Sequence, residues 1–220
     1  MTTKEIIDAF NFRHACKIFD KNKKISQDDF NTILEVARLS PSSFGFEPWK
    51  FLVVQDMNLR DKLLPATWGA LNILPTASHF VIILARKKPT LLYNSDYITH
   101  MMYDIHNIPK EKAEARREKY KKFQEEDFDL LSDDRYIFDW ASKQTYIALG
   151  NMMSVAAMLG IDSCAVEGFE KDKLEQIIKE DFGIDTDIFG VSVMVGFGYR
   201  LNEQPKKTRQ SISDIVEWIQ

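Results

Sequence analysis

The feature that most limits how this chain can fold is a long helical segment predicted over residues 133–159. Ser132 precedes the segment, and Gly160 stands where a helix-ending glycine is preferred. From Ile147 onward the residues are apolar on most faces, so this part of the helix must be buried on nearly all sides. A buried helix of about seven turns is either the spine of a domain or part of a dimer interface.

Short apolar runs rich in β-formers predict the strands that such a helix would cover. These strands are scattered among helices without strict strand–helix–strand alternation. They therefore indicate an α+β domain with a mixed central sheet flanked by helices, rather than a doubly wound fold. The predicted strands are residues 51–54, 80–84, 161–166 and 191–195.

The first half of the chain also carries capping signals for helices. Thr3 is the expected N-cap of the first helix, and Ser26 opens a second helix that ends at Ser40-Pro41. Residues 94–127 are predicted to be helical and highly charged, with acidic and basic residues interleaved. Such interleaving is typical of a solvated helix face.

The length of 220 residues, of which 45% are hydrophobic, is enough to bury one core. We therefore expect a single domain over residues 1–220, with a helical excursion at about 90–130 and a C-terminal arm at about 200–220. The pattern at 211–219 does not distinguish a helix from a strand.

Charge and composition exclude several classes of protein. The net charge of −4 argues against a nucleic-acid binder. Cys16 and Cys164 are far apart and are expected to be buried, reduced thiols, and no histidines have metal-ligand spacing. Because no apolar run could span a bilayer and the N-terminus has no apolar leader segment, we expect a soluble, cytoplasmic protein without a membrane partner.

Two separate basic groups and a pair of hydroxyls are the residues best suited to bind a ligand. Arginine forks, lysine charges and serine hydroxyls together suit a phosphate monoester. On composition alone, each group is better interpreted as a charged helix end or tail. The groups are Arg13-His14 with Lys17, Lys206-Lys207 with Arg209, and Ser42-Ser43.

Several short motifs stand in a fixed order from one end of the chain to the other. Together they resemble the nitroreductase family of FMN proteins, and most of all the bacillus-type NAD(P)H-dependent enzymes of its minor oxygen-insensitive group. The motifs are Arg13-His14-Ala15-Cys16-Lys17-Ile18-Phe19, Pro41-Ser42-Ser43 with Pro48-Trp49, Ala77-Ser78-His79, Ile147-Ala148-Leu149-Gly150-Asn151, Glu167-Gly168-Phe169 and Lys207-Thr208-Arg209.

The resemblance implies a nitroreductase-like fold that binds FMN in an intertwined homodimer, with the FMN site at the subunit interface. By similarity, Arg13, His14, Lys207 and Arg209 hold the phosphate and ribityl end of FMN. Lys17 points at the pyrimidine edge of the flavin ring, where a cation stabilises the negative charge left by reduction.

Other FMN contacts that the resemblance implies come from two loops. The backbone N–H groups of Glu167 and Gly168 are expected to bond the N5/O4 edge of the ring, where glycine permits close approach. A second loop would reach the FMN held mainly by the other subunit. The residues of that loop are Pro41, Ser42, Ser43 and Phe44.

The chain departs from the family pattern at a few of these positions. Ala15 replaces the usual serine or threonine, so one hydroxyl contact to FMN is lost. Gly45 and Glu47 stand where relatives often have asparagine and glutamine. Asn72 matches the family's flavin-contacting asparagine only with a one-residue gap in the alignment.

The function implied by the resemblance is that of an FMN-dependent oxidoreductase with NAD(P)H as co-substrate. It would reduce nitroaromatics, quinones or related small-molecule acceptors by two-electron, ping-pong hydride transfer, without a protein nucleophile. Phe44, Phe46, Phe123 and Phe128 are candidate walls of the acceptor pocket, or simply core residues.

Four alternatives remain open from the sequence. A flavin, enone or flavin-fragmenting reductase would use the same fold, and a redox-silent FMN-binding protein would use the same site. The other two bind no flavin: an interaction protein that uses the basic helix at 110–122, and an apolar dimer without a small ligand.

Overall fold

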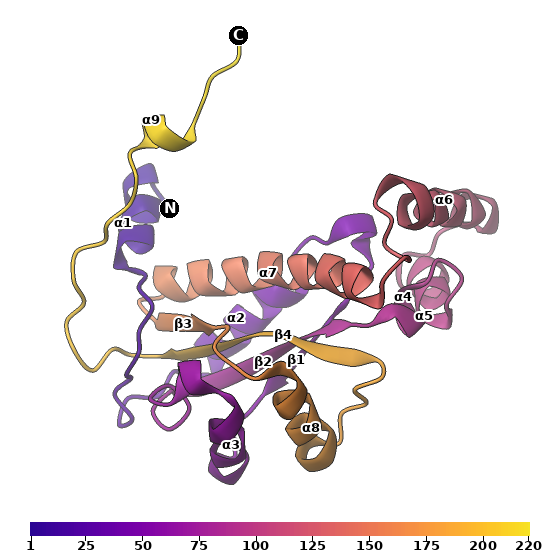
Figure 1. Ribbon diagram of the computed structural model, residues 1–220. Coiled ribbons are helices and arrows are strands. Elements are labelled where there is room, and N and C mark those ends of the chain that lie inside the picture. Colours follow the sequence, from indigo (N-terminus) through magenta and orange to yellow (C-terminus); the bar gives the residue numbers. More distant parts are fainter.

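Four strands form one sheet in the order β1-β2-β4-β3 in the computed structural model, which describes residues 1–220 (Figure 1). All neighbouring strands are antiparallel, so the predicted mixed sheet is wrong for this chain. Helices cover both faces of the sheet, and its central strands β2 and β4 therefore carry the continuous apolar runs that parallel strands also show. The strands are β1 (Trp49–Val53), β2 (His79–Arg86), β3 (Asp162–Val166) and β4 (Phe189–Gly198).

Successive residues of β2 divide between two hydrophobic cores, as the two-residue period of a strand requires. Ile82 and Leu84 pack toward α3 and α8, whereas Val81 and Ile83 pack toward α2 and α7. Figure 1 shows α7 across one face of the sheet and α3 and α8 on the other. The helices are α1 (Thr3–Phe12), α2 (Gln27–Arg38), α3 (Met57–Leu63), α4 (Lys88–Leu91), α5 (Asp96–His100), α6 (Lys110–Lys122), α7 (Asp134–Met158), α8 (Lys171–Phe182) and α9 (Ile212–Ile215).

Helix α7 confirms the long helix predicted from the sequence. The side chain of Asp133 caps its first turn, and Gly160, with a φ of 72°, follows its end. The expectation that its second half is buried on nearly all sides is wrong for the single chain, because Ile147 and Met158 are exposed. A face of α7 that is apolar in sequence is thus left uncovered.

Helix boundaries differ from the predictions in three places. Thr2, not Thr3, caps α1, because its hydroxyl accepts from the backbone N–H of Glu5. Helix α2 ends at Arg38, before Ser40-Pro41. The continuous helix expected at 94–127 is broken between α5 and α6 by a non-helical stretch that includes Pro109, which lacks a backbone N–H.

The segment Lys88–Asp127 carries α4, α5 and α6 and stands out from one end of α7 (Figure 1). Two π-helical turns, Met101–Ile105 and Phe123–Asp127, lie on either side of α6. A third core joins this segment to the body, with Tyr120 and Trp140 among its buried side chains. We call Lys88–Asp127 the helical excursion.

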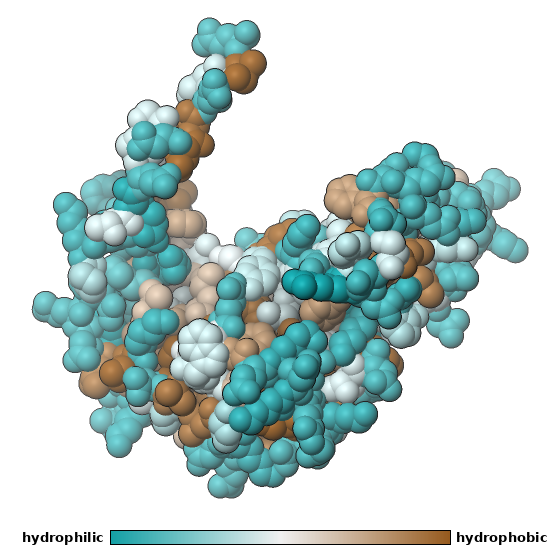
Figure 2. Space-filling model, in the orientation of Figure 1, coloured by the Kyte–Doolittle hydropathy of each residue, from teal (hydrophilic) through white to brown (hydrophobic).

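The chain after β4 runs past α1 and ends in a projecting arm (Figure 1). The stretch predicted without a type contains only the short α9, followed by residues without regular structure. Apolar side chains lie along this arm in Figure 2, and Trp218 and Ile219 are each 85% exposed. No helix of the chain has both the length and the apolar character needed to cross a membrane.

Candidate functional site

Two segments far apart in sequence meet beside the end of α1 and form a small cationic pocket. The residues after α1 supply Arg13, His14 and Ala15, and the residues after β4 supply Lys207 and Arg209. The cavity between them has a volume of about 270 Å³. The structure thus brings together the two basic groups that the sequence singled out.

The pocket holds positive charge that no acidic side chain neutralises. Arg13, Lys207 and Arg209 form no salt bridge. Partial burial, and then the nearby Arg13 and Arg209, lower the pKa of Lys207. A cluster of unpaired cations that repel one another is an arrangement that a bound dianion stabilises.

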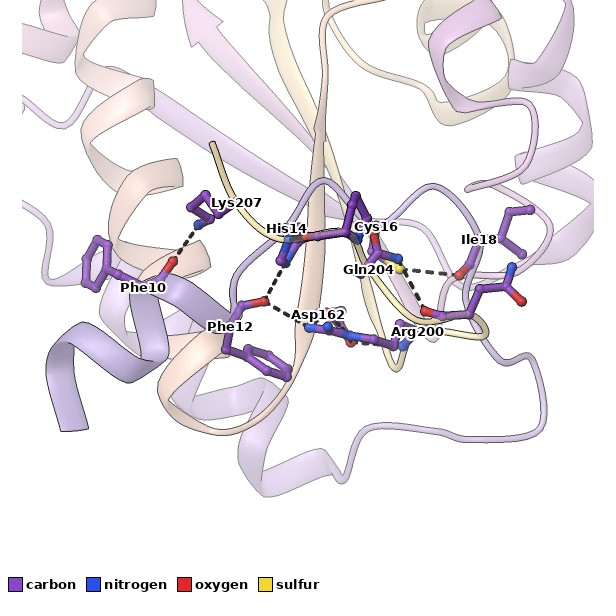
Figure 3. A network of polar contacts seen from close by, with 11 residues as sticks. Phe10, Phe12, His14, Cys16, Ile18, Asp162, Arg200, Gln204 and Lys207 are labelled. Carbon is purple, nitrogen blue, oxygen red and sulfur yellow. Dashed lines mark hydrogen bonds and ion pairs between the residues drawn. The ribbon is translucent and has the colours of Figure 1, made fainter. Parts of the chain in front are cut away.

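Backbone and histidine contacts fix the shape of this pocket (Figure 3). The imidazole of His14 lies between two carbonyl oxygens, at 2.9 Å from Phe12 and 2.7 Å from Pro205. The ammonium of Lys207 donates to the carbonyl of Phe10, which ties the C-terminal segment to α1. The two halves of the pocket are therefore joined directly.

An ion pair that the sequence analysis missed anchors the same region. Arg200 forms a bidentate salt bridge with the buried carboxylate of Asp162 and donates to the carbonyl of Phe12 at 2.9 Å. Because Arg200 neutralises Asp162, that carboxylate does not cancel the charge of the pocket. The two partners are far apart in sequence, so no local pattern could have revealed the pair.

Lys17 does not line the cationic pocket and lies beside the edge strand β3. Lys17 is an exposed residue, and its ammonium lies 3.5 Å from the sulfur of Cys164. Burial raises the pKa of the Cys164 thiol, and Lys17 partly offsets this effect. Burial also raises the pKa of Cys16 to about 11. Both cysteines are free and buried, as predicted.

A pair of glycines brings a third part of the site close to β3. The backbone N–H of Gly69 donates to the carbonyl of Gly168 at 2.8 Å, and the two backbones are in contact. The N–H groups of Glu167 and Gly168 themselves donate to no group of the protein. Two adjacent unpaired donors are available to an acceptor on a ligand. Asn72 lies on the turn that follows Gly69 and is exposed.

Gly168→Ala tests how closely these backbones approach. A Cβ at this position would lie 2.7 Å from Cα of Gly69 and 2.9 Å from its nitrogen, and backbone atoms cannot move aside cheaply. We expect a loss of about 1–3 kcal/mol in the free energy of unfolding, measured by urea denaturation. Gly150→Ala is the control, because a Cβ added there meets no other atom of the chain within 4 Å. Gly183 is equally open but has a left-handed φ, so alanine would be strained there. Equal stability of Gly168→Ala and the wild type would contradict the close approach.

Glu167 also uses its side chain. Its carboxylate accepts a hydrogen bond of 2.5 Å from the hydroxyl of Tyr146 on α7. Burial and this carboxylate raise the pKa of Tyr146, so the phenol stays protonated. The bond holds the 167–168 turn against the middle of α7.

The loop that contains Pro41, Ser42, Ser43 and Phe44 lies elsewhere in the chain. The N–H of Ser43 donates to the side chain of Gln144 on α7 at 2.8 Å. Phe44 packs on Tyr120, with ring centroids 4.9 Å apart. The single chain does not bring this loop to the cationic pocket.

Of the residues predicted to form walls of the acceptor pocket, Phe46 is fully buried in the core, whereas Phe128 is 57% exposed.

A larger cavity of about 870 Å³ lies between α7, α8 and the start of β4, but its cationic side chains are already paired with carboxylates. Lys87 contacts Glu175 at 2.8 Å, and Lys88 contacts Asp134 at 2.6 Å. This cavity therefore offers no free cation to an anionic ligand, in contrast to the smaller pocket.

Comparison with known proteins agrees with the fold and the motifs. The profile of the Nitroreductase family matches residues 11–199. A Bacillus subtilis (strain 168) protein, provisionally named NAD(P)H nitroreductase YfkO, is 52% identical over 215 residues, which cover 98% of this chain and 97% of that protein. A Staphylococcus aureus (strain USA300) protein with a similar provisional name is 54% identical over 97% of this chain and 95% of its own length.

Among solved structures, a nitroreductase-type protein of Exiguobacterium sibiricum, described as a complex with FMN, superposes with a TM-score of 0.77. It shares 22% sequence identity and covers 100% of this chain and 99% of its own. At this identity the match shows a shared fold. Its FMN is a property of that protein.

Proposed function

The chain belongs to the nitroreductase family, and from that premise we propose that it is an FMN-dependent NAD(P)H oxidoreductase that reduces nitroaromatics, quinones or related acceptors. The observation that carries the proposal is the placement of an unneutralised cationic pocket and two free backbone N–H groups on either side of Lys17. A flavin mononucleotide has a dianionic end and a ring with acceptors, which match these two groups of donors.

The residues present fit FMN part by part. Arg13, His14, Lys207 and Arg209 would hold its phosphate and ribityl end, and the N–H groups of Glu167 and Gly168 would bond the edge of its ring. Ala15 lines the pocket but has no hydroxyl to offer. Asn72, exposed on the turn that follows Gly69, would add a side-chain contact to the ring.

Bound FMN would supply the hydride chemistry. The protein would bind the FMN, orient its ring and tune its reduction potential. Lys17 would stabilise negative charge at the pyrimidine edge of the ring. NAD(P)H and the acceptor would bind in turn on the same exposed face of the flavin ring, which is the basis of a ping-pong cycle.

We infer that the working form is a homodimer with its FMN sites at the subunit interface. The loop with Ser42 and Ser43 is remote from the pocket of its own chain, so it can contact FMN only across an interface. The uncovered face of α7 and the exposed apolar side of α1 lie between the excursion and the C-terminal arm (Figure 2). Apolar surface of this extent on a folded chain is typical of a protein interface.

Ile7→Glu is expected to separate this dimer. Ile7 on α1 is 55% exposed in the single chain, so the substitution adds a charge without disturbing the core. A charge buried without a partner at an interface is strongly unfavourable. Sedimentation velocity should show monomers for Ile7→Glu and dimers for the wild type. Met57→Glu is the matched control, because Met57 is 45% exposed at the start of α3, on the opposite face of the sheet. A dimeric Ile7→Glu would contradict the interface.

The activity itself is tested with anaerobic protein reconstituted with FMN. We expect NADPH or NADH to bleach the absorbance of the bound flavin and a nitroaromatic to restore it. A protein that binds FMN but is bleached by neither nicotinamide is a redox-silent FMN carrier, and the reductase proposal then fails. A protein that takes up no FMN leaves the flavin-free alternatives, a basic-helix interaction protein or an apolar dimer. Bleaching without reoxidation by nitroaromatics or quinones indicates a flavin or enone reductase.

A further inference from the structure

The loop from Ser42 to Glu47, which follows α2, has an unusual backbone. Phe44, Gly45 and Glu47 all have left-handed conformations, with φ values of 57°, 67° and 44°. Residues other than glycine adopt this conformation at a cost, so two of these three positions are strained. Such a loop keeps its shape only where other groups hold it.

The helical excursion supplies most of the groups that hold this loop. Arg116 on α6 donates to the carbonyl of Phe44. The hydroxyl of Tyr97 on α5 lies 2.8 Å from the carbonyl of Phe46 and 2.9 Å from that of Glu47. Three of the loop's carbonyl groups are thus bonded by two side chains that lie fifty or more residues away.

Within the loop, the hydroxyl of Ser42 accepts from the N–H of Glu47 at 2.9 Å. The neighbouring Ser43 is tied to α7 through Gln144. The end of the loop with the serines is therefore fixed to the body of the protein, and the end with Phe46 and Glu47 is fixed to the excursion. A change at either end alters the backbone between them.

Tyr97 is itself held in place from the sheet. The guanidinium of Arg86, at the end of β2, lies 3.5 Å from the centroid of the Tyr97 ring. Burial raises the pKa of Tyr97, so its hydroxyl remains a donor across the physiological range. The side chain that bonds two loop carbonyls is thus placed by packing and does not depend on the loop alone.

We propose that Tyr97 and Arg116 are positioning residues for the FMN site, which hold the 42–47 loop in the conformation that presents Ser42 and Ser43 to the flavin of the other subunit. The proposal rests on the proposed function for the identity of the ligand. Its structural part, that the excursion holds the loop, does not depend on any ligand. The excursion thus acts on the flavin site through the 42–47 loop, by the bonds from Tyr97 and Arg116.

The structural part is tested by hydrogen exchange on the full-length protein without flavin, comparing Tyr97→Phe with Tyr103→Phe. Both variants lose one hydroxyl on the excursion, but Tyr103 bonds only Glu114, at the surface. We expect exchange of the amides within residues 42–49 to become at least tenfold faster in Tyr97→Phe and to stay unchanged in Tyr103→Phe. Unchanged exchange in Tyr97→Phe overturns the proposal.

The functional part is tested by the FMN dissociation constant, measured by fluorescence titration. We expect about a tenfold weaker affinity in Tyr97→Phe and in Arg116→Met, and wild-type affinity in Tyr103→Phe. The effect of Tyr97→Phe should shrink in a Ser42→Ala background, because both act through the same loop.

The outcomes separate this proposal from the proposed function. If exchange in the loop becomes faster but FMN affinity stays at the wild-type value, the positioning role is overturned. If the losses of FMN affinity in Tyr97→Phe and Ser42→Ala are additive, Tyr97 does not act through Ser42 and the loop. If the wild-type protein takes up no FMN, the proposed function is wrong. The hydrogen-exchange comparison of Tyr97→Phe with Tyr103→Phe still tests whether the excursion holds the loop.

Discussion

Arg13→Ala is expected to yield a protein that folds normally but purifies with less bound flavin than the wild type. Arg13 lines the cationic pocket and forms no salt bridge, so its charge is available to a phosphate. A charge-assisted hydrogen bond contributes about 1.5–3 kcal/mol, so FMN should bind about 10- to 100-fold more weakly. The ratio of flavin to protein absorbance and a fluorescence titration measure the loss.

Arg13→Ala should weaken the affinity for FMN without lowering the stability of the flavin-free protein. Arg13 helps to lower the pKa of Lys207 through repulsion, so removing Arg13 relieves an unfavourable interaction. We therefore expect the melting temperature without FMN to be unchanged or slightly higher, and the stabilisation at a fixed FMN concentration to be smaller than in the wild type. Arg135→Ala is the control, since Arg135 is exposed and pairs only with Asp139 at 3.2 Å. Full FMN affinity in Arg13→Ala would show that the pocket holds something else.

The sequence predicts the elements of this fold better than it predicts their arrangement. All four strands and the long helix are found where apolar runs and periodicity place them, because burial imposes those patterns locally. Strand direction has no such local signal. The mixed sheet was predicted from the order of strands and helices, which does not determine strand direction. The apolar runs of the antiparallel β2 and β4 do not determine it either, because both faces of these strands are covered.

Helix ends and exposed faces were harder to predict for a related reason. Thr2 and Thr3 are equally good N-caps by residue type, but only Thr2 has the capping-box spacing to Glu5, and the structure shows this capping box. The apolar second half of α7 predicted burial, and the single chain leaves part of it open. The apolar pattern of a helix therefore does not distinguish a core within the chain from a core shared with another copy.

The candidate site was predicted as separate groups of residues, and the structure adds the contacts that join them. Motif spacing indicated Arg13 and Lys207, but not the bond from Lys207 to the carbonyl of Phe10. Gly168 was expected to permit close approach to a ligand. It also packs against Gly69, a partner that the sequence did not reveal. Pairs of this kind depend on tertiary packing, which leaves no trace in local sequence.

Lys17→Met is expected to keep FMN bound while lowering its two-electron reduction potential. Lys17 lies outside the cationic pocket and is placed over β3 beside Cys164, so it takes no part in holding the phosphate. An ammonium near the ring favours the reduced form, which carries more negative charge. Because Lys17 is exposed, screening limits this effect to about 1.4–3 kcal/mol, which corresponds to about 30–60 mV for two electrons.

The potential is measured by equilibration with a reference dye, and the affinity for FMN is measured in the same preparation. Lys21→Met is the control, because Lys21 is an exposed lysine in the turn that follows and belongs to no part of the site. We expect a lower potential and slower reduction by NADPH in Lys17→Met alone. If Lys17→Met and Arg13→Ala lose FMN to the same extent, the two cations share one task. The assignment of Lys17 to the ring and of Arg13 to the phosphate would then be wrong.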